Sequence, residues 1–115
     1  METEIYNLEE RTLKFSKDII RLCKSASRGI VNNNLCDQLV RSGTSIGANY
    51  REANETDTKK DFRNRIRISK KEAKETIYWL ELLKDANNNL EKIDSLLKES
   101  CELMKILSAI YEKTK

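Results

Sequence analysis

One stretch of the sequence predicts the fold most directly: Leu39-Val-Arg-Ser-Gly-Thr-Ser-Ile-Gly-Ala-Asn-Tyr-Arg-Glu-Ala53. At helical spacing, its apolar and small residues form one stripe that begins a turn earlier: Leu35, Leu39, Ser42, Ile46, Asn49 or Tyr50, and Ala53. Gly43 and Gly47 lie in the middle of this stretch, although a glycine inside a helix costs about 1 kcal/mol relative to alanine. We therefore expect another helix to approach closely at these small residues, and the rest of the chain to pack around this central helix.

The composition predicts one all-α domain spanning residues 1–115. The chain is 36% charged, contains no proline and only three glycines, and has few aromatic residues. This composition disfavours sandwiches, barrels and long ordered loops. A chain of this length also buries a core without the help of disulfides or metal ions.

Four amphipathic helices are predicted, at about residues 5–27, 35–54, 59–86 and 89–113. A possible capping pair lies at each start, with its second residue in the first turn. The pairs are Asn7 and Glu10, Asn34 and Asp37, Thr58 and Asp61, and Asn88 and Glu91. For the last helix, the spacing predicts a buried stripe of Leu90, Ile93, Leu97, Cys101 or Ser100, Met104, Leu107 and Tyr111. Because the connections are short, we expect an antiparallel up-down-up-down four-helix bundle.

The third helix has more apolar residues than one buried face can hold. Its core line runs through Phe62, Ile66, Ser69, Ala73, Thr76 or Ile77, Leu80 and Leu83. Tyr78, Trp79 and Leu82 lie beside that line. A helix with apolar residues on two faces is either central or packed against another subunit. We expect these three residues to form an interface between subunits.

The residue types argue against catalysis and metal binding. The sequence contains no histidine, so the commonest general base at neutral pH is missing and no Glu-x-x-His metal motif is possible. Cys23, Cys36 and Cys101 form no C-x-x-C pair, and each lies on or near an apolar stripe. We expect no enzymatic activity, no metal and no cofactor.

The same features bear on localisation. Free thiols are typical of a reducing compartment. The acidic start, Met1-Glu-Thr-Glu-Ile5, lacks the hydrophobic run of a signal peptide, and no apolar stretch is long enough to cross a bilayer. We expect a cytoplasmic protein without a membrane partner.

Positive charge is concentrated in the third helix. Residues 59–74 carry a net charge of +6, whereas the whole chain carries +3. Five of these cations recur at spacings of three and four and so share one helix face: Lys60, Arg63, Arg67, Lys70 and Lys74, called here the basic row. A row about 21 Å long can contact several phosphates of a nucleic acid. No aromatic residue lies within the row, so we expect no stacking of nucleic-acid bases on it. A solvated lysine-rich surface is the alternative interpretation.

A polar cluster accompanies the central stretch. Its members are Arg41, Ser45, Asn49, Glu52 and, on the third helix, Glu75. We expect Arg41 to form an ion pair with Glu75, or with Glu72, within one subunit or across an interface. Ser45 and Asn49 are expected to hydrogen-bond to a neighbouring helix.

The residues quoted above, with Asp61-Phe62 and Glu72-Ala-Lys-Glu-Thr-Ile-Tyr-Trp-Leu-Glu-Leu-Leu83, resemble the bacterial four helix bundle protein family over nearly the whole chain. This family is also called the ribosomal-RNA intervening-sequence protein family. The polar cluster lies on its recurrent polar positions. Gly47 stands where the broader family has proline, and Arg51-Glu-Ala53 where it has A-E-G, which places the chain in a subgroup.

The resemblance implies an antiparallel four-helix bundle that assembles into a homo-oligomeric ring, a pentamer in relatives. The sequence is also similar to the accessory variability determinant of diversity-generating retroelements, which implies RNA or DNA and a reverse transcriptase as partners. We therefore expect a non-enzymatic oligomer that binds nucleic acid through the basic row. The alternative is a structural or adaptor module that contacts only proteins.

Overall fold

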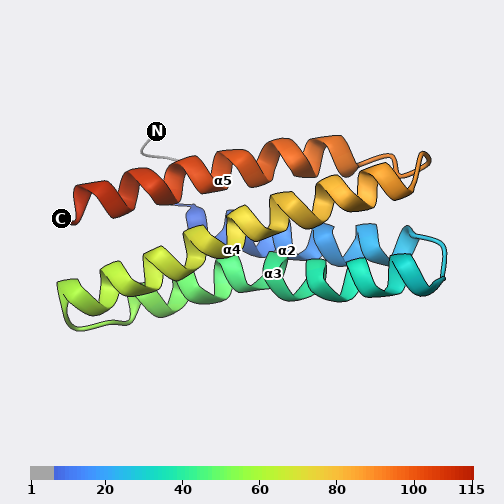
Figure 1. The fold of residues 1–115 in the computed structure, drawn as a ribbon. Coiled ribbons are helices and arrows are strands. Elements are labelled where there is room, and N and C mark those ends of the chain that lie inside the picture. Colours follow the sequence, from blue (N-terminus) through green and yellow to red (C-terminus); the bar gives the residue numbers. More distant parts are fainter. Residues whose placement is uncertain (1–6) are drawn as a thin grey trace.

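The computed structural model describes residues 7–115, and this part of the chain forms four helices and no strand. The helices are α2 (Leu8–Ser25), α3 (Ile30–Asn54), α4 (Lys59–Ala86) and α5 (Ile93–Lys113). Consecutive helices run in opposite directions and lie side by side (Figure 1). The all-α class and the packing of the helices as a bundle are therefore confirmed. The bundle is elongated, with extents of 44 × 25 × 19 Å, because α4 alone is about 42 Å long.

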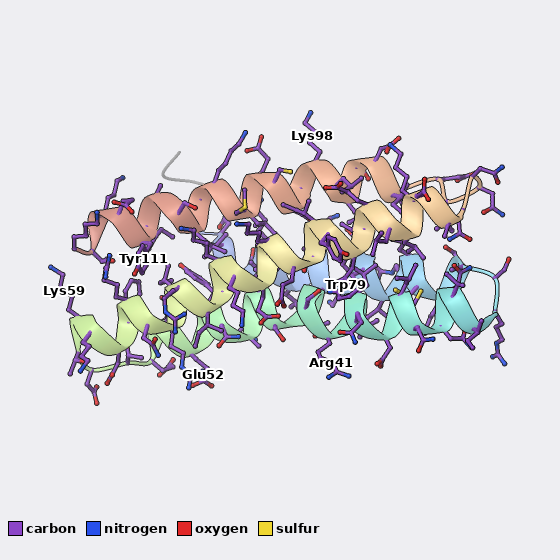
Figure 2. The ribbon with its side chains drawn as sticks, in the orientation of Figure 1. Arg41, Glu52, Lys59, Trp79, Lys98 and Tyr111 are labelled. Atoms are coloured by element: carbon purple, nitrogen blue, oxygen red, sulfur yellow. The ribbon has the colours of Figure 1, made fainter. Side chains whose placement is uncertain are left out.

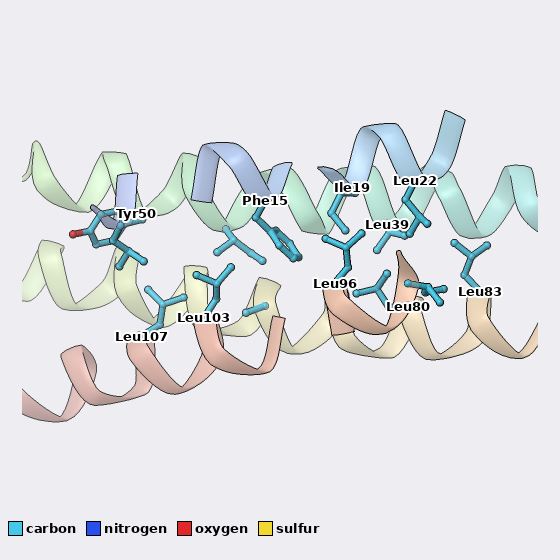
Figure 3. Packing of buried hydrophobic residues seen from close by; sticks show 14 of the residues in the cluster. Phe15, Ile19, Leu22, Leu39, Tyr50, Leu80, Leu83, Leu96, Leu103 and Leu107 are labelled. Carbon is cyan, nitrogen blue, oxygen red and sulfur yellow. The ribbon is translucent and has the colours of Figure 1, made fainter. Parts of the chain in front are cut away.

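All four helices contribute to one hydrophobic core. Phe15 and Ile19 of α2 face Leu39 of α3, Leu80 of α4 and Leu96 of α5 in the interior (Figure 3). The spacing of three and four residues places such side chains on one face of each helix, and their burial is the main contribution to stability. The predicted stripes of α3 and α4 are confirmed at most positions.

The close approach predicted at the glycines is made by α2. A Cβ atom added to Gly47 would lie 2.8 Å from Thr12 Oγ1 and 3.0 Å from Thr12 Cβ. A Cβ atom on Gly43 would lie 3.1 Å from both Cγ atoms of Ile19. These distances are shorter than normal carbon contacts, so only glycine allows α2 and α3 to pack this closely. The Ser16 hydroxyl also donates to Gly43 O at 3.4 Å.

On its other flank, α3 contacts α4 through hydroxyl groups. Ser69 Oγ donates to Ile46 O at 2.7 Å, and Thr76 Oγ1 donates to Ser42 Oγ at 3.0 Å. These three hydroxyl side chains are buried, and each has a partner, as buried polar groups require. Small hydroxyl residues therefore let α4 lie close to α3.

Two helix starts differ from the prediction. Helix α3 begins at Ile30, five residues earlier than expected, and Asn34 is inside the helix, where its Nδ2 donates to Ile30 O at 2.9 Å. Helix α5 begins at Ile93 rather than near residue 89. Neither Asn34 nor Asn88 is therefore an N-cap.

At the other two starts, the structure supports one capping pair. Asn7 makes no side-chain capping bond among the described residues, whereas Thr58 caps α4 as predicted by accepting from Asp61 N at 3.1 Å. The predicted start of the first helix at about residue 5 lies outside the described residues. Its predicted end at residue 27 was wrong by two residues, since α2 ends at Ser25.

The buried stripe of α5 agrees with the predicted one at Ile93, Leu107 and the alternative Ser100, and differs from it by one residue between these positions. Leu96, Ser100 and Leu103 are buried, whereas Leu97 and Met104 are half-buried at the edge of the core. Both sets satisfy the spacing of three and four, because apolar residues occur in adjacent pairs at these positions. The rotation of α5 against the other three helices decides which set is buried.

The close approach of α2 and α3 predicts an unusual result for glycine substitution. Gly47→Ala should lower the free energy of unfolding by about 1–2 kcal/mol, because the overlap with Thr12 outweighs the gain in helix propensity. Gly29→Ala, whose added Cβ meets nothing within 4 Å, is the control and should change stability by less than about 1 kcal/mol. Urea denaturation of both variants, with and without Thr12→Ala, measures the effect. If Gly47→Ala lowers the free energy of unfolding by the same amount in the Thr12→Ala background, the proposed contact is contradicted.

Candidate nucleic-acid interface

The basic row runs from the first turn of α4 to just past its middle, and two of its members face α5. Lys60, Arg67 and Lys74 are exposed, whereas Arg63 and Lys70 are half-buried. The row follows one face because its members are three or four residues apart on a helix. It spans about 21 Å, the length occupied by about six phosphates of one strand of duplex DNA.

Arg63 and Lys70 are drawn toward α5 by an aromatic side chain. The guanidinium carbon of Arg63 lies 3.8 Å from the centroid of the Tyr111 ring, and Lys70 Nζ lies 5.4 Å from it. The Tyr111 side chain lies between α5 and the first half of α4 (Figure 2). Cations at such distances are attracted to the face of an aromatic ring. Two of the five cations are therefore held in position by α5.

Within the described part of the chain, the basic row lacks carboxylate partners, as do other exposed lysines such as Lys17 and Lys98, but only the basic row groups five such cations on one helix face. Among residues 7–115, none of its five members forms an ion pair. Elsewhere, Arg11 makes a bidentate pair with Glu99 at 2.7 and 2.8 Å, and Lys14 and Arg21 both contact Asp18. The net positive charge of residues 59–74 in the sequence is thus also a net positive charge on one part of the protein surface.

The predicted interface residues form a partly exposed apolar patch on the second half of α4. Tyr78 is 58% exposed and Leu82 is 36% exposed, while Trp79 is half-buried against the core. The rings of Tyr78 and Trp79 contact each other edge to face, with centroids 5.1 Å apart. We refer to these three residues as the aromatic patch.

The start of α3 is also apolar and exposed. Asn32 in the first turn of α3 exchanges hydrogen bonds of 2.9 and 3.0 Å with Asn87 at the end of α4. This pair places the start of α3 beside the end of α4. Ile30 and Val31 are 80% and 56% exposed. Sequence reasoning missed these two residues because they were assigned to a connection.

Within one subunit, Arg41 does not form the predicted ion pair with Glu75 or Glu72, and the alternative pair across an interface stays a prediction. Arg41 Nη2 contacts Asp37 Oδ2 at 3.2 Å, one turn earlier on the same helix, and both side chains are about two-thirds exposed. Figure 2 shows Arg41 projecting away from the bundle. The buried stripe through Leu39, Gly43 and Ile46 places Arg41 on the outer side of α3.

The other members of the polar cluster follow the prediction only in part. Asn49 Oδ1 accepts from Arg65 Nη1 of α4 at 3.2 Å, which confirms a hydrogen bond between helices. Ser45 Oγ instead donates to Arg41 O at 2.7 Å within its own helix, so that prediction was wrong. Glu52 is exposed on α3. The cluster is therefore a polar surface of α3 with one bond to α4.

Glu72 and Glu75 are two carboxylates close together on α4. Burial raises the pKa of Glu72 above its ordinary value of 4.5, and the charge of Glu75 raises it further. Lys71 has the opposite, smaller effect. The side of α4 beside α3 thus carries an unfavourable pair of like charges.

The described residues were also compared with the requirements of a metal site, a membrane-spanning helix and a disulfide. In the described part of the chain, no group of three or more histidine, cysteine, aspartate or glutamate side chains is placed to hold a metal ion. None of the helices between residues 7 and 115 combines the length and apolar character needed to span a membrane. Cys23, Cys36 and Cys101 are free thiols and half-buried.

Comparison with known proteins gives a family and a similar structure. Residues 4–109 match the family model described as 23S rRNA-intervening sequence protein. The chain is also similar to the crystal structure of a protein with unknown function from the S23 ribosomal protein family of Bacteroides thetaiotaomicron VPI-5482. The two are 38% identical, with a TM-score of 0.80 over 90% of this chain and 96% of that chain. No curated protein matches this chain significantly.

The raised pKa of Glu72 predicts how stability depends on pH. The folded protein binds a proton at Glu72 more tightly than the unfolded chain does, so ionised Glu72 destabilises the fold at neutral pH. Glu72→Gln should therefore raise the free energy of unfolding at pH 7 by less than about 1 kcal/mol, and the gain should vanish as the pH falls below 4.5. Denaturation of the two proteins between pH 3 and pH 7 measures this, with Glu81→Gln, an exposed glutamate of α4, as the control. A gain independent of pH would contradict the assignment.

Proposed function

Because this chain belongs to the 23S rRNA-intervening sequence protein family, we propose that it is a non-enzymatic homo-oligomer that binds RNA or DNA through the basic row. The observation that supports this proposal is the set of five cations on one face of α4 without a carboxylate partner among the described residues. An unpaired row of cations favours a polyanion, and the length of the row suits a nucleic-acid backbone. We propose that the protein acts in the cytoplasm.

The proposed contact is with phosphates rather than bases. Arg67 and Lys74 are exposed, and the ring of Tyr111 is already covered by Arg63. Lysine and arginine contacts to phosphate position a strand without reading its sequence. Binding should therefore tolerate many sequences and weaken steeply as salt is raised.

Self-association is proposed to occur through the aromatic patch. Tyrosine and tryptophan are enriched at protein interfaces, and an exposed apolar patch on a small domain indicates a contact surface. Ile30 and Val31 at the start of α3 are further exposed apolar residues that an interface could cover. Several copies of the basic row in one ring, a pentamer as in the relatives described above, would raise the affinity for one strand through effective concentration.

A protein-only adaptor is the second candidate function. The aromatic patch favours it, because that surface suits another protein as well as a second copy of this chain. A reverse transcriptase is the partner that the resemblance implies. The two predictions that follow distinguish an oligomer that binds nucleic acid from an adaptor.

Charge reversal tests nucleic-acid binding. Arg67→Glu with Lys74→Glu should weaken binding to RNA or DNA by at least about tenfold and reduce the slope of log K against log salt by about two. The matched control is Lys17→Glu with Lys98→Glu, two exposed lysines on α2 and α5 that change the net charge by the same amount. Band shifts at two salt concentrations measure both. Equal losses in the two double variants would show that only net charge matters, and that the basic row is not the binding surface.

Light scattering coupled to size-exclusion chromatography tests the oligomer. The wild-type protein should have a mass several times that of the 13.4 kDa chain. Tyr78→Glu with Leu82→Glu should give the monomer, because it places two charges in the proposed interface. Leu13→Glu with Ile20→Glu changes two comparably exposed residues on α2 and should leave the mass unchanged. A wild-type monomer would contradict the proposed ring.

A further inference from the structure

One end of the basic row borders a depression between α4 and α5. Its volume is about 450 Å³, and it lies between the first turns of α4 and the last turn of α5. The lining residues are Lys60, Asp61, Arg63, Asn64, Arg67 and Tyr111. Three of the six are cations of the basic row, so the charge converges on one place rather than being spread evenly along α4.

The Arg63 side chain in this depression is positioned but not fully satisfied. Its guanidinium group is held over the ring of Tyr111 at 3.8 Å, which restricts its conformations. Its Nε atom is buried and has no hydrogen-bond acceptor among residues 7–115. A buried donor without an acceptor is costly, and the planar guanidinium suits an oxyanion with two or more oxygens. The site therefore favours an anion that supplies oxygens at Arg63.

Positive charge dominates the surroundings of the depression. Lys70 lies 5.4 Å from the Tyr111 ring, and Lys59 lies in the first turn of α4. The carboxylate of Glu112 already pairs with Lys115 at 2.8 Å. The pKa of Glu112 is lowered, first by Lys115 and to a smaller extent by Arg63 and Lys70. The site thus has a net positive charge, because Lys60, Arg63 and Arg67 outnumber Asp61, the one carboxylate in its lining.

We propose that this depression binds a phosphate monoester, the terminal phosphate of an RNA or DNA strand. This inference rests on the proposed function and adds that a strand end, not only its backbone, is recognised. A terminal monoester carries nearly two negative charges at pH 7 and has three free oxygens, whereas a backbone diester carries one charge. Lys60, Arg63 and Arg67 suit the dianion because three cations line one small depression. The depression would therefore select the doubly charged terminal phosphate and make no contact with the neighbouring bases.

The test compares a short RNA with a 5′-phosphate to the same RNA with a 5′-hydroxyl, both labelled at the 3′ end. Fluorescence anisotropy with the full chain should show about tenfold tighter binding of the phosphorylated RNA. Inorganic phosphate should reduce this preference more than a chloride salt of equal ionic strength does. A phosphate on the 3′ end, with the label moved to the 5′ end, shows whether either terminus is accepted.

Two substitutions locate the site. Arg63→Gln should abolish the preference, and it should weaken the hydroxyl-ended RNA less than the phosphorylated RNA because Arg67 and Lys74 still contact the backbone. Lys60→Gln, which changes an exposed lining residue and leaves the Arg63–Tyr111 contact intact, should reduce the preference without affecting folding. Lys98→Gln on the outer side of α5 is the control and should retain it. Thermal melts show that each variant is folded.

The outcomes separate this inference from the proposed function. Equal affinity of the wild-type protein for both RNAs would overturn the terminal-phosphate site and leave backbone binding standing. A preference that survives both Arg63→Gln and Lys60→Gln would also overturn it. Failure of the wild-type protein to bind either RNA would overturn both proposals.

Discussion

The close approach of α2 to α3 is the constraint on which the arrangement of the other helices depends. At Gly43 and Gly47, α3 has no side chain, and Ile19 and Thr12 of α2 occupy the space that a methyl group would need. The opposite flank of α3 carries Ser42, whose hydroxyl accepts from α4. Because both flanks are thin, α3 packs closely against two neighbours, and its wide contact with α4 aligns that helix along the bundle.

The position of α4 between α3 and α5 determines what its outer face presents. The inner side is buried through residues such as Ile66, Ala73 and Leu80. The remaining surface is basic over the first half and aromatic over the second. Because no described carboxylate pairs with the basic row, its charge stays available to a ligand, whereas the Arg11–Glu99 pair on another face is already satisfied. One helix therefore carries both surfaces for which we propose functions.

Much of the fold follows from residue spacing, and the failures have a common physical cause. The buried stripes of α3 and α4 were predicted because, in each helix, one line of small and apolar residues recurs at helical spacing over the whole length. In α5, Leu96 and Leu97 compete for the same position, and the spacing alone cannot choose between them. The early start of α3 was missed because Asn34 bonds to backbone within the helix as readily as at its start. Local patterns are least informative where two local solutions have similar energies.

The sequence by itself determined the all-α class, the number of helices in residues 7–115 and the presence of a cationic face on α4, because these depend on side chains three or four residues apart. Only the tertiary structure decided which side chains from different helices meet. It brings Tyr111 of α5 onto Arg63 of α4, and it turns Arg41 toward Asp37 rather than Glu75. Such contacts depend on the rotation and axial offset of one helix against another. Packing across the whole core sets these two quantities, and the periodicity of a single helix does not contain them.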